Sequence, residues 1–176
     1  IPMGDELTFD LLQKGRTVGV FQLESSGMQE LLRKIQPTAF EDIVAVNALF
    51  RPGPLGAGMD EVYVECKHGR KKVTFPHEDL KPILEETYGV ILYQEQVMQI
   101  ASAMGGFSLG QADTLRKAMG KKKIEIMEKM RILFLDGAEG KGYDRTLAGK
   151  VFDDMAFFAE YGFNKSHSAS YAVLSM

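Results

Sequence analysis

The sequence predicts a mainly α-helical fold, an irregular multi-helix domain with a few short β-strands. Apolar residues recur at helical spacing over most of the 176 residues, serine precedes several of these stretches, and glycine or proline interrupts them. Stretches rich in β-branched and aromatic residues are few and short. The length suits one domain or two small ones. The sequence contains no internal repeat and no low-complexity linker, and we assign residues 1–176 to one domain.

The first half of the chain is expected to form four helices, over residues 8–13, 26–37, 40–50 and 58–67. Ser26 is the predicted N-cap of the second helix, with Gln29 completing a capping box. Strands are expected at residues 17–23 and 72–75, where β-branched and aromatic residues gather. The segment from Arg51 to Gly56 is rich in proline and glycine, so we expect a stiff turn that cannot be helical.

The second half is expected to be helical over residues 78–86, 94–104, 108–120, 124–135 and 144–161, with a further helix at the end. Gly89 to Tyr93 forms either a buried strand or the lead into the next helix. Ser108 is the predicted N-cap of the helix that follows the Gly105-Gly106 break. In this helix, the residues expected on one apolar stripe are Leu109, Ala112, Leu115 and Met119. A glycine-rich loop is expected between the last two long helices, and a loop over residues 162–168 leads into the final one.

Composition excludes several classes of protein. Apolar residues make up 45% and charged residues 26%, which is ordinary for a soluble globular protein. Cys66 is the single cysteine, so no intramolecular disulfide forms and a reducing cytosol is the natural setting. No apolar run approaches the roughly 20 residues of a membrane span, and the N-terminus lacks the features of a signal peptide. We therefore expect a cytoplasmic protein with no membrane contact.

Positive charge is concentrated in one segment, although the chain carries a net charge of −3. Between Thr114 and Arg131, basic residues far outnumber the acidic ones, Glu125 and Glu128. The basic residues are Arg116, Lys117, Lys121, Lys122, Lys123, Lys129 and Arg131. A polyanion responds to the local field of such a patch more than to the domain average. If Gly120 ends the helix, the three consecutive lysines project from a turn. The segment is a candidate phosphate-binding site, and an idle solvated helix face is the alternative.

Two further polar motifs are candidates of lower specificity. Asn164-Lys-Ser-His167 gathers polar groups where a helix begins, a position whose free N–H groups favour anions. The alternative is that Ser166 or Ser168 caps the helix while His167 packs locally. Arg51, beside a rigid turn, is either an anion contact or a structural corner paired with a carboxylate.

Spacing excludes other chemistries. Gly120-Lys-Lys-Lys is not a P-loop, because no glycine lies five residues earlier and no Ser or Thr follows the lysine. Cys66, His68 and His77 lack a fourth zinc ligand at suitable spacing. Ser166-His-Ser168 lacks the flanking glycines and the strand of a nucleophile elbow. We therefore expect neither a catalytic residue nor a metal site in this chain.

The two ends of the sequence suggest part of a longer protein. The chain starts at Ile1 rather than at a methionine, and its last residues look like a helix without a terminating glycine. We therefore expect an excised segment.

Five segments together resemble the fingers domain of the bacterial DNA polymerase III alpha subunit, a C-family replicative polymerase. They occur in the family's order and span nearly the whole chain. The segments are Val20–Ser25, Leu49–Leu55, Tyr88–Met98, Leu115–Lys122 and Tyr161–Ala172. Five blocks in register are far more specific than any one of them.

The resemblance implies a nucleotide-binding role in DNA replication. In this family the fingers close over the nascent base pair and supply basic residues to the triphosphate of the incoming dNTP. The residues at the family's motif positions are Arg116, Lys117, Lys121, Lys122, Asn164, Lys165 and His167, with Arg51, Lys123, Gln94 and Gln96 as secondary candidates. Many relatives have arginine where this chain has Lys117, which keeps the charge but loses the planar fork.

The resemblance assigns the chemistry to a palm domain that is missing from this sequence. In the family, that domain precedes this region and holds two Mg²⁺ ions through aspartates. Asp153-Asp154 is expected on a helix surface and does not replace them. We therefore expect the parent to be a DNA-directed DNA polymerase, a nucleotidyltransferase that uses Mg²⁺ through the palm, and this fragment to be inactive alone. Expected partners are dNTP and primer-template DNA, with other replicase subunits and a sliding clamp bound through regions outside this fragment.

Two other functions stay open. A non-catalytic nucleic-acid-binding module would bind strands without preferring nucleoside triphosphates. A helical protein-interaction domain would show no salt-dependent binding to DNA, because its basic segment would merely be solvated.

Overall fold

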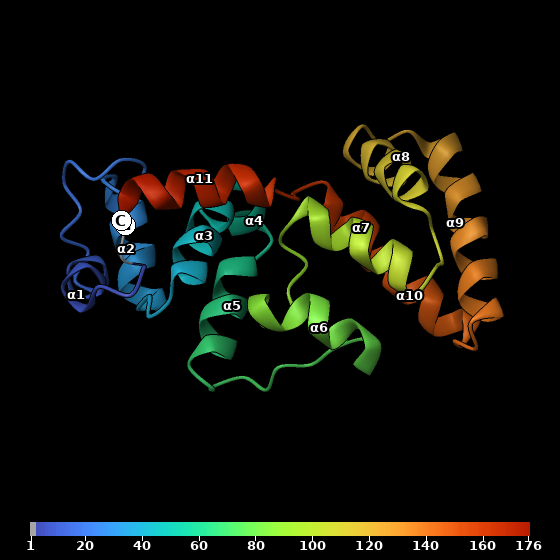
Figure 1. The fold of residues 1–176 in the computed structure, drawn as a ribbon, viewed down its shortest axis with the longest axis horizontal. Helices are drawn as coiled ribbons and strands as arrows, with labels where there is room; N and C mark the ends of the chain where they lie inside the picture. The colour runs from blue at the N-terminus through green and yellow to red at the C-terminus, as the bar shows by residue number, and fades with distance from the viewer. Residues whose placement is uncertain (1–2) are drawn as a thin grey trace. The chain divides into compact units, whose positions relative to one another are not determined.

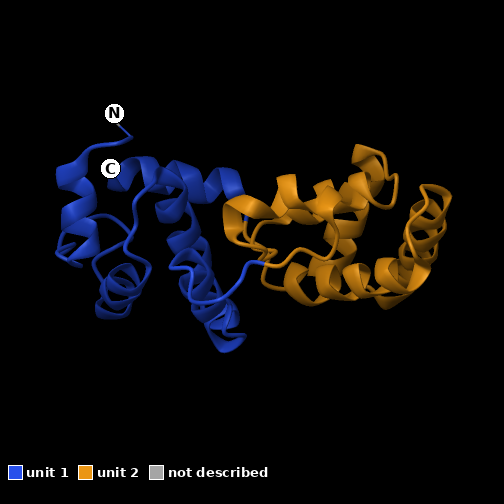
Figure 2. Cartoon of the chain, turned by 90° about the horizontal axis from the view of Figure 1, so that it is seen from below, with its two compact units in different colours: residues 1–73, 164–176 blue, residues 74–163 orange. Residues whose placement is uncertain are grey.

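A computed structural model describes residues 3–176, which form eleven α-helices and two 3₁₀ turns (Figure 1). Ile1 and Pro2, on which the expectation about the start of the chain rests, lie outside the described residues. The chain divides into two compact units (Figure 2): unit 1 comprises residues 1–73 and 164–176, and unit 2 comprises residues 74–163. Unit 1 is therefore built from both ends of the chain. None of the helices formed by residues 3–176 has the length and apolar character needed to cross a membrane.

Unit 1 is organised around one buried helix. Its helices are α1 (Glu6–Gln13), α2 (Ser26–Ile35), α3 (Phe40–Leu49), α4 (Pro52–Gly56), α5 (Met59–Lys67) and α11 (Lys165–Ser175). Most side chains of α3 are buried, so it is covered on several sides rather than on one stripe. The C-terminal helix α11 packs along α3, and the Ser168 hydroxyl donates to the Val44 carbonyl at 2.6 Å. This contact fixes the first turn of α11 within unit 1.

The segment from Arg51 to Gly56 is helical, so the prediction of a non-helical turn is wrong. Residues Pro52–Gly56 form α4, with Arg51 as its N-cap. Both prolines lie in the first turn, where backbone N–H groups have no partner within the helix. A proline that lacks this group loses no hydrogen bond there, and its fixed φ favours the start of a helix.

The expected strands are also absent from the described residues. Gly19 and Gln22 have φ of +81° and +66°, so residues 17–23 follow a series of turns rather than an extended path. The Thr17 hydroxyl closes this loop by donating to the Leu23 carbonyl at 2.5 Å. Residues 72–75 have no regular secondary structure, and they pair with no neighbouring strand within residues 3–176. The fold is mainly α-helical, as predicted, without the predicted strands.

Unit 2 has its own core around aromatic side chains. Its elements are η1 (Glu78–Leu80), α6 (Lys81–Leu84), η2 (Glu85–Thr87), α7 (Gln94–Ala103), α8 (Leu109–Gly120), α9 (Ile124–Gly140) and α10 (Arg145–Ala159). The fully buried Phe134 ring lies 6.1 Å from the Phe107 ring and 5.6 Å from the Phe152 ring. The single helix expected over residues 78–86 is broken into three short pieces. Pro82, which lacks the N–H that would extend η1, lies in the first turn of α6.

Helix α9 continues through two glycines that were expected to lie in a loop. A Cβ atom on Gly137 would lie 2.0 Å from the Gly105 carbonyl oxygen, whereas one on Gly140 would meet nothing within 4 Å. Gly137 therefore lets the backbone of α9 approach the chain that follows α7. Gly137 is needed for this close approach, and α9 forms despite the low helix propensity of glycine.

Replacing Gly137 by alanine is expected to destabilise unit 2 by about 1–3 kcal/mol, because the contacting atom is backbone and cannot move aside as a side chain can. Gly140→Ala in the same helix is the matched control. It is expected to leave stability unchanged or to raise it by less than about 1 kcal/mol. Urea unfolding of both variants measures the difference, and equal midpoints would contradict the close packing.

Candidate phosphate-binding site

The basic segment lies on α8 and the turn that follows it. Ser108 caps the helix, as predicted, and forms a reciprocal capping box with Gln111. Ala112, Leu115 and Met119 are buried, which confirms most of the predicted stripe and fixes the orientation of the helix. Leu109 is 78% exposed, so its assignment to the buried stripe is wrong. It is the first residue of the helix and lies beyond the part that the core covers.

Asp113 holds the two cations at the centre of the segment. Its Oδ1 atom accepts from Arg116 Nη2 at 2.7 Å and from Arg116 Nε at 3.1 Å, while its Oδ2 atom lies 2.6 Å from Lys117 Nζ. These contacts span one helical turn, the spacing at which side chains meet on a helix. Hydrogen bonds from Lys117 and then Arg116 hold the pKa of Asp113 below its usual value. The carboxylate is therefore ionised at neutral pH.

Gln94 connects Arg116 to the end of unit 2. The Gln94 side-chain oxygen accepts from Arg116 Nη1 at 3.0 Å, and its amide nitrogen donates to the Gly162 carbonyl at 3.2 Å. The backbone nearby is paired as well: Gln94 N donates to Phe163 O at 2.9 Å, and Phe163 N donates to Leu92 O at 3.1 Å. Residues 89–93 are therefore the lead into α7, with only an isolated parallel bridge between Tyr93 and Phe163. Arg116 is held from two sides.

Gln96 is buried and satisfied within the protein. Its oxygen accepts from Leu92 N at 2.8 Å and Tyr93 N at 2.9 Å, and its amide donates to Thr87 Oγ1 at 2.8 Å and Ile83 O at 3.1 Å. With 1% of the residue exposed, Gln96 anchors the N-terminus of α7. Gln94, two residues earlier, is the member of this pair that reaches the basic segment.

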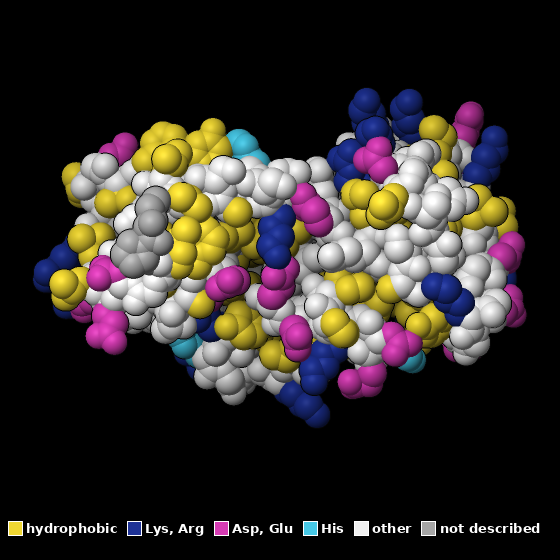
Figure 3. All heavy atoms as spheres, viewed as in Figure 1, with side chains coloured by type: hydrophobic (Ala, Val, Ile, Leu, Met, Phe, Trp, Pro, Cys, Tyr) yellow, Lys and Arg dark blue, Asp and Glu magenta, His cyan; other side chains and the backbone are white. Residues whose placement is uncertain are grey.

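The three lysines after α8 lie in an exposed turn. The helix ends at Gly120, and Lys122 has a left-handed backbone with φ of +52°. Lys122 Nζ lies 2.7 Å from Glu160 Oε1, and this hydrogen bond raises the pKa of Lys122. Lys121 and Lys123 are exposed and form no ion pair with any residue from 3 to 176. We call Arg116, Lys117, Lys121, Lys122 and Lys123 the basic cluster. Lysine and arginine side chains gather over α8 and the start of α9, at the upper right of Figure 3.

The remaining candidates lie in unit 1. Asn164 is the N-cap of α11, and its side-chain oxygen accepts from His167 N at 2.8 Å, so neither Ser166 nor Ser168 has the capping role. The His167 ring contacts Tyr171 at 4.4 Å between centroids, and Tyr171 stacks on Phe21 at 5.4 Å. Lys165 is the first residue of α11 and is partly exposed.

Arg51 is half-buried beside α4. Its Nε atom donates to the Ala48 carbonyl at 3.0 Å, and burial lowers the pKa of its guanidinium. The partner that this nitrogen has is a backbone carbonyl, whereas a carboxylate was expected as the alternative to an anion contact. Arg51 belongs to unit 1, whereas the basic cluster belongs to unit 2.

Two residues that shape the cluster were not predicted from the sequence. Asp113 lies one residue before the stretch counted as basic, and its spacing of three and four residues from Arg116 and Lys117 is a signal that identifies it. Glu160 has no such local signal, because it comes from the end of α10. The cluster is therefore partly neutralised by its own protein.

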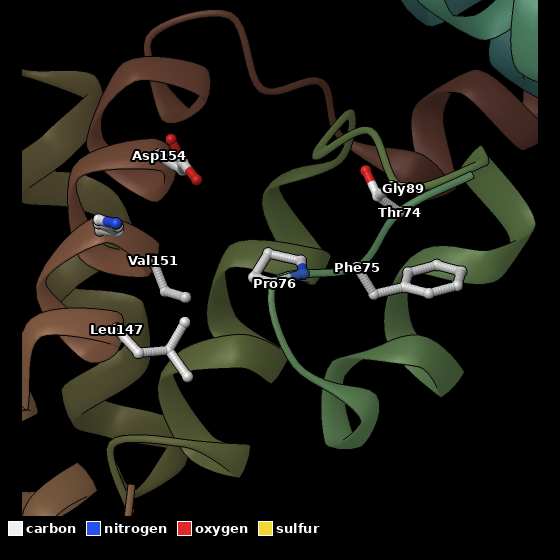
Figure 4. A pocket seen from close by; sticks show the side chains of 8 residues that line it. Thr74, Phe75, Pro76, Gly89, Leu147, Val151 and Asp154 are labelled. Carbon is white, nitrogen blue, oxygen red and sulfur yellow. The ribbon is translucent and has the colours of Figure 1, made fainter. Parts of the chain in front are cut away.

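A separate hollow of about 350 Å³ lies beside α10 (Figure 4). Leu147 and Val151 point from α10 toward Pro76, and the Phe75 ring turns away. Asp154 lies at the edge, where burial and then the neighbouring Asp153 raise the pKa of its carboxyl. Lys150 is the only cation among the residues that line this hollow. Its apolar wall and single lysine suit phosphate groups less well than the basic cluster does.

The acidic side chains of residues 3–176 are not grouped as a metal site requires. No group of three His, Cys, Asp or Glu side chains within residues 3–176 is arranged to hold a metal. The carboxylates near the basic cluster, Asp113 and Glu160, are each held by cations. Asp153 is paired with Arg131 at 3.1 Å. The residues present do not fit the metal centre of a polymerase.

Residues 3–176 thus form a helical protein of two units, and unit 2 carries a surface cluster of lysine and arginine. Comparison with known proteins gives the family: the chain belongs to the bacterial DNA polymerase III alpha subunit finger domain family, whose model matches residues 1–142. The resemblance predicted from the five segments is thereby confirmed.

Individual relatives agree with the family. The chain is 56% identical over 180 residues to the DNA polymerase III subunit alpha of Escherichia coli (strain K12), covering 99% of this chain and 16% of that protein. The Haemophilus influenzae protein of the same name has the same identity and coverage. The Aquifex aeolicus one is 51% identical over 175 residues, 99% of this chain and 15% of that protein. The chain thus spans about 16% of the length of these relatives.

Replacing Gln96 by leucine is expected to destabilise unit 2, because the N–H groups of Leu92 and Tyr93 lose their acceptor. Each buried group left unpaired costs about 1–3 kcal/mol. Gln99→Leu, on the exposed side of the same helix, is the control and is expected to change stability by less than about 0.5 kcal/mol. Thermal unfolding compares the two variants. Equal melting temperatures would show that Gln96 does not anchor α7.

Proposed function

We propose that this chain is the fingers domain of a bacterial replicative DNA polymerase and that its basic cluster binds the triphosphate of the incoming dNTP. The observation that carries the proposal is the placement of Arg116 and Lys117 side by side on α8, followed by an exposed turn of three lysines. A triphosphate needs several cations at fixed separations, and arginine adds a planar pair of donors for phosphate oxygens. Membership of the finger domain family supports the same role.

The mechanism of the cluster is electrostatic. Arg116, Lys117 and the lysine turn would together neutralise the triphosphate and stabilise the negative charge that builds on the leaving pyrophosphate. Arg116 Nη1 donates a hydrogen bond to the Gln94 side-chain oxygen, and this contact holds the guanidinium in place. The role of the cluster is thus to position and stabilise phosphate groups, and no bond is made or broken by its side chains.

The two units contribute different groups to the proposed domain. Unit 1 supplies Asn164, Lys165 and His167 at the start of α11 as further phosphate contacts, with Arg51 as a secondary one. In unit 2, Gln94 acts on Arg116, and we assign Gln96 to the support of α7. The aromatic stack of Phe21, Tyr171 and His167 adds flat surfaces of the kind on which nucleobases pack. Closure of the fingers over the nascent base pair is part of this proposal.

The rest of the enzyme lies outside this chain. We propose that a palm domain binds Mg²⁺ and carries out nucleotidyl transfer, and that the parent is a DNA-directed DNA polymerase of the bacterial cytoplasm. Primer-template DNA and dNTP are its proposed substrates. Contacts with other replicase subunits and a sliding clamp are assigned to other regions of the polymerase.

In the full-length polymerase, Arg116→Ala is expected to lower kcat/KM for dNTP by up to about 10³-fold, because the arginine acts where phosphate charge develops. Primer-template binding should change little. Lys129→Ala, which removes an exposed cation from α9, is the control for loss of positive charge. Steady-state primer extension and DNA-binding titrations measure both effects.

The competing function is a sequence-independent contact with the DNA backbone. It predicts that Arg116→Ala weakens all DNA binding equally and lowers the slope of log K against log salt by about one unit. If the dNTP kinetics of that variant are unchanged, Arg116 binds the DNA backbone and not the triphosphate.

The isolated 176-residue chain is expected to incorporate no nucleotide into a primer, because two-metal catalysis needs grouped carboxylates and residues 3–176 contain no such group. A radiolabelled primer-extension assay with Mg²⁺ and all four dNTPs tests this expectation. The full-length polymerase serves as the positive control. Incorporation by the isolated chain, after removal of contaminating polymerase, would contradict it.

A further inference from the structure

Asp113 occupies the part of Arg116 that a phosphate group would use. The Nε and Nη2 atoms form the side edge of the guanidinium, and both contact Asp113 Oδ1, at 3.1 and 2.7 Å. The third nitrogen, Nη1, is engaged by Gln94. Paired donors on one guanidinium edge are the arrangement that binds phosphate or carboxylate oxygens in parallel. With Asp113 in place, that edge is closed to a triphosphate.

Lys117 is occupied by the same carboxylate. Its Nζ atom lies 2.6 Å from Asp113 Oδ2, so the two oxygens of one carboxylate engage the two adjacent cations. Asp113 therefore imitates two oxygens of a bound phosphate. Glu160 has the corresponding role at Lys122, at 2.7 Å.

The ion pairs of Asp113 and Glu160 are exposed to solvent, so an incoming anion can replace either carboxylate. The side chains of Asp113 and Arg116 are 35% and 26% exposed, and those of Lys117 and Glu160 are 59% and 42% exposed. Ion pairs with this much solvent contact are weak, and a more highly charged anion competes with them effectively. A carboxylate brings one negative charge to the pair of cations, whereas a triphosphate brings several.

We propose that Asp113 is an internal competitor for the phosphate site: it holds Arg116 and Lys117 while the site is empty, is displaced by the triphosphate, and returns as pyrophosphate leaves. This inference rests on the proposed function of the basic cluster. Asp113 acts through Arg116 and Lys117, so it is a positioning residue that tunes affinity for both the nucleotide and the product. A site of bare cations would bind pyrophosphate more tightly and release it more slowly.

Asp113→Asn in the full-length polymerase tests the proposal, because asparagine has nearly the same shape without the charge. The expected result is a fall of about two- to fivefold in both the KM for dNTP and the inhibition constant of pyrophosphate, the factor that corresponds to an exposed ion pair. The turnover number should not rise in parallel. Damage to the fold would weaken nucleotide binding, so tighter binding cannot arise from it.

Asp153→Asn is the matched control. It makes the same change in net charge within unit 2 and removes an arginine partner, Arg131, that is not in the basic cluster. It is expected to leave both constants unchanged. Measuring both variants at two salt concentrations separates the local effect from a general one, because displacement of Asp113 should matter less at high salt.

Two outcomes overturn the inference. An unchanged or higher KM for dNTP in Asp113→Asn would show that the carboxylate does not compete, and a higher KM would make it an anchor that helps nucleotide binding. Arg116→Ala distinguishes this failure from failure of the proposed function. If that variant loses nucleotide affinity, only the role of Asp113 is refuted. If it keeps wild-type dNTP kinetics, the proposed triphosphate site itself is refuted.

Discussion

The N-terminus of α7 is fixed by backbone pairing with Phe163 and by a hydrogen bond from the Gln94 side chain to the Gly162 carbonyl, and the position of Arg116 in the basic cluster depends on that junction. Gln94 lies at this junction, where its backbone pairs with Phe163 and its side chain joins Gly162 to Arg116. Gln96 completes the junction by accepting the two preceding N–H groups. The Arg116 guanidinium is therefore held by Gln94, which is itself hydrogen-bonded to residues 162 and 163, as well as by Asp113 of its own helix.

The positive charge of the basic cluster is partly balanced by carboxylates of the same unit. The chain is acidic overall, with a net charge of −3, yet the cluster carries five cations close together. Asp113 and Glu160 neutralise part of this charge and leave Lys121 and Lys123 without an ion pair among residues 3–176. The five cations of the basic cluster outnumber these two carboxylates, so the cluster keeps positive charge that its own ion pairs do not neutralise.

Local sequence signals predicted much of this arrangement. The Ser108 cap and the helix end at Gly120 follow from short-range chemistry, and so does the position of the basic segment. Sequence patterns gave the wrong prediction at glycine and proline. Gly137 lies inside α9, where the absence of a side chain lets the backbone at Gly105 approach, and Pro52 is the first residue of α4. Contacts between distant parts of the chain, such as Gln94 with Gly162, carry no local signal. Only the structure therefore shows that Gln94 contacts Arg116, whereas Gln96 is buried and hydrogen-bonds the backbone before α7.

The most direct measurement is a structure of the full-length polymerase with primer-template DNA and an incoming dNTP. We expect the Arg116 guanidinium and the Lys117 ammonium to lie within about 3 Å of triphosphate oxygens, with Asp113 turned away from both. Triphosphate oxygens bound by other side chains, with Arg116 still paired to Asp113 or placed against the DNA backbone, would contradict it.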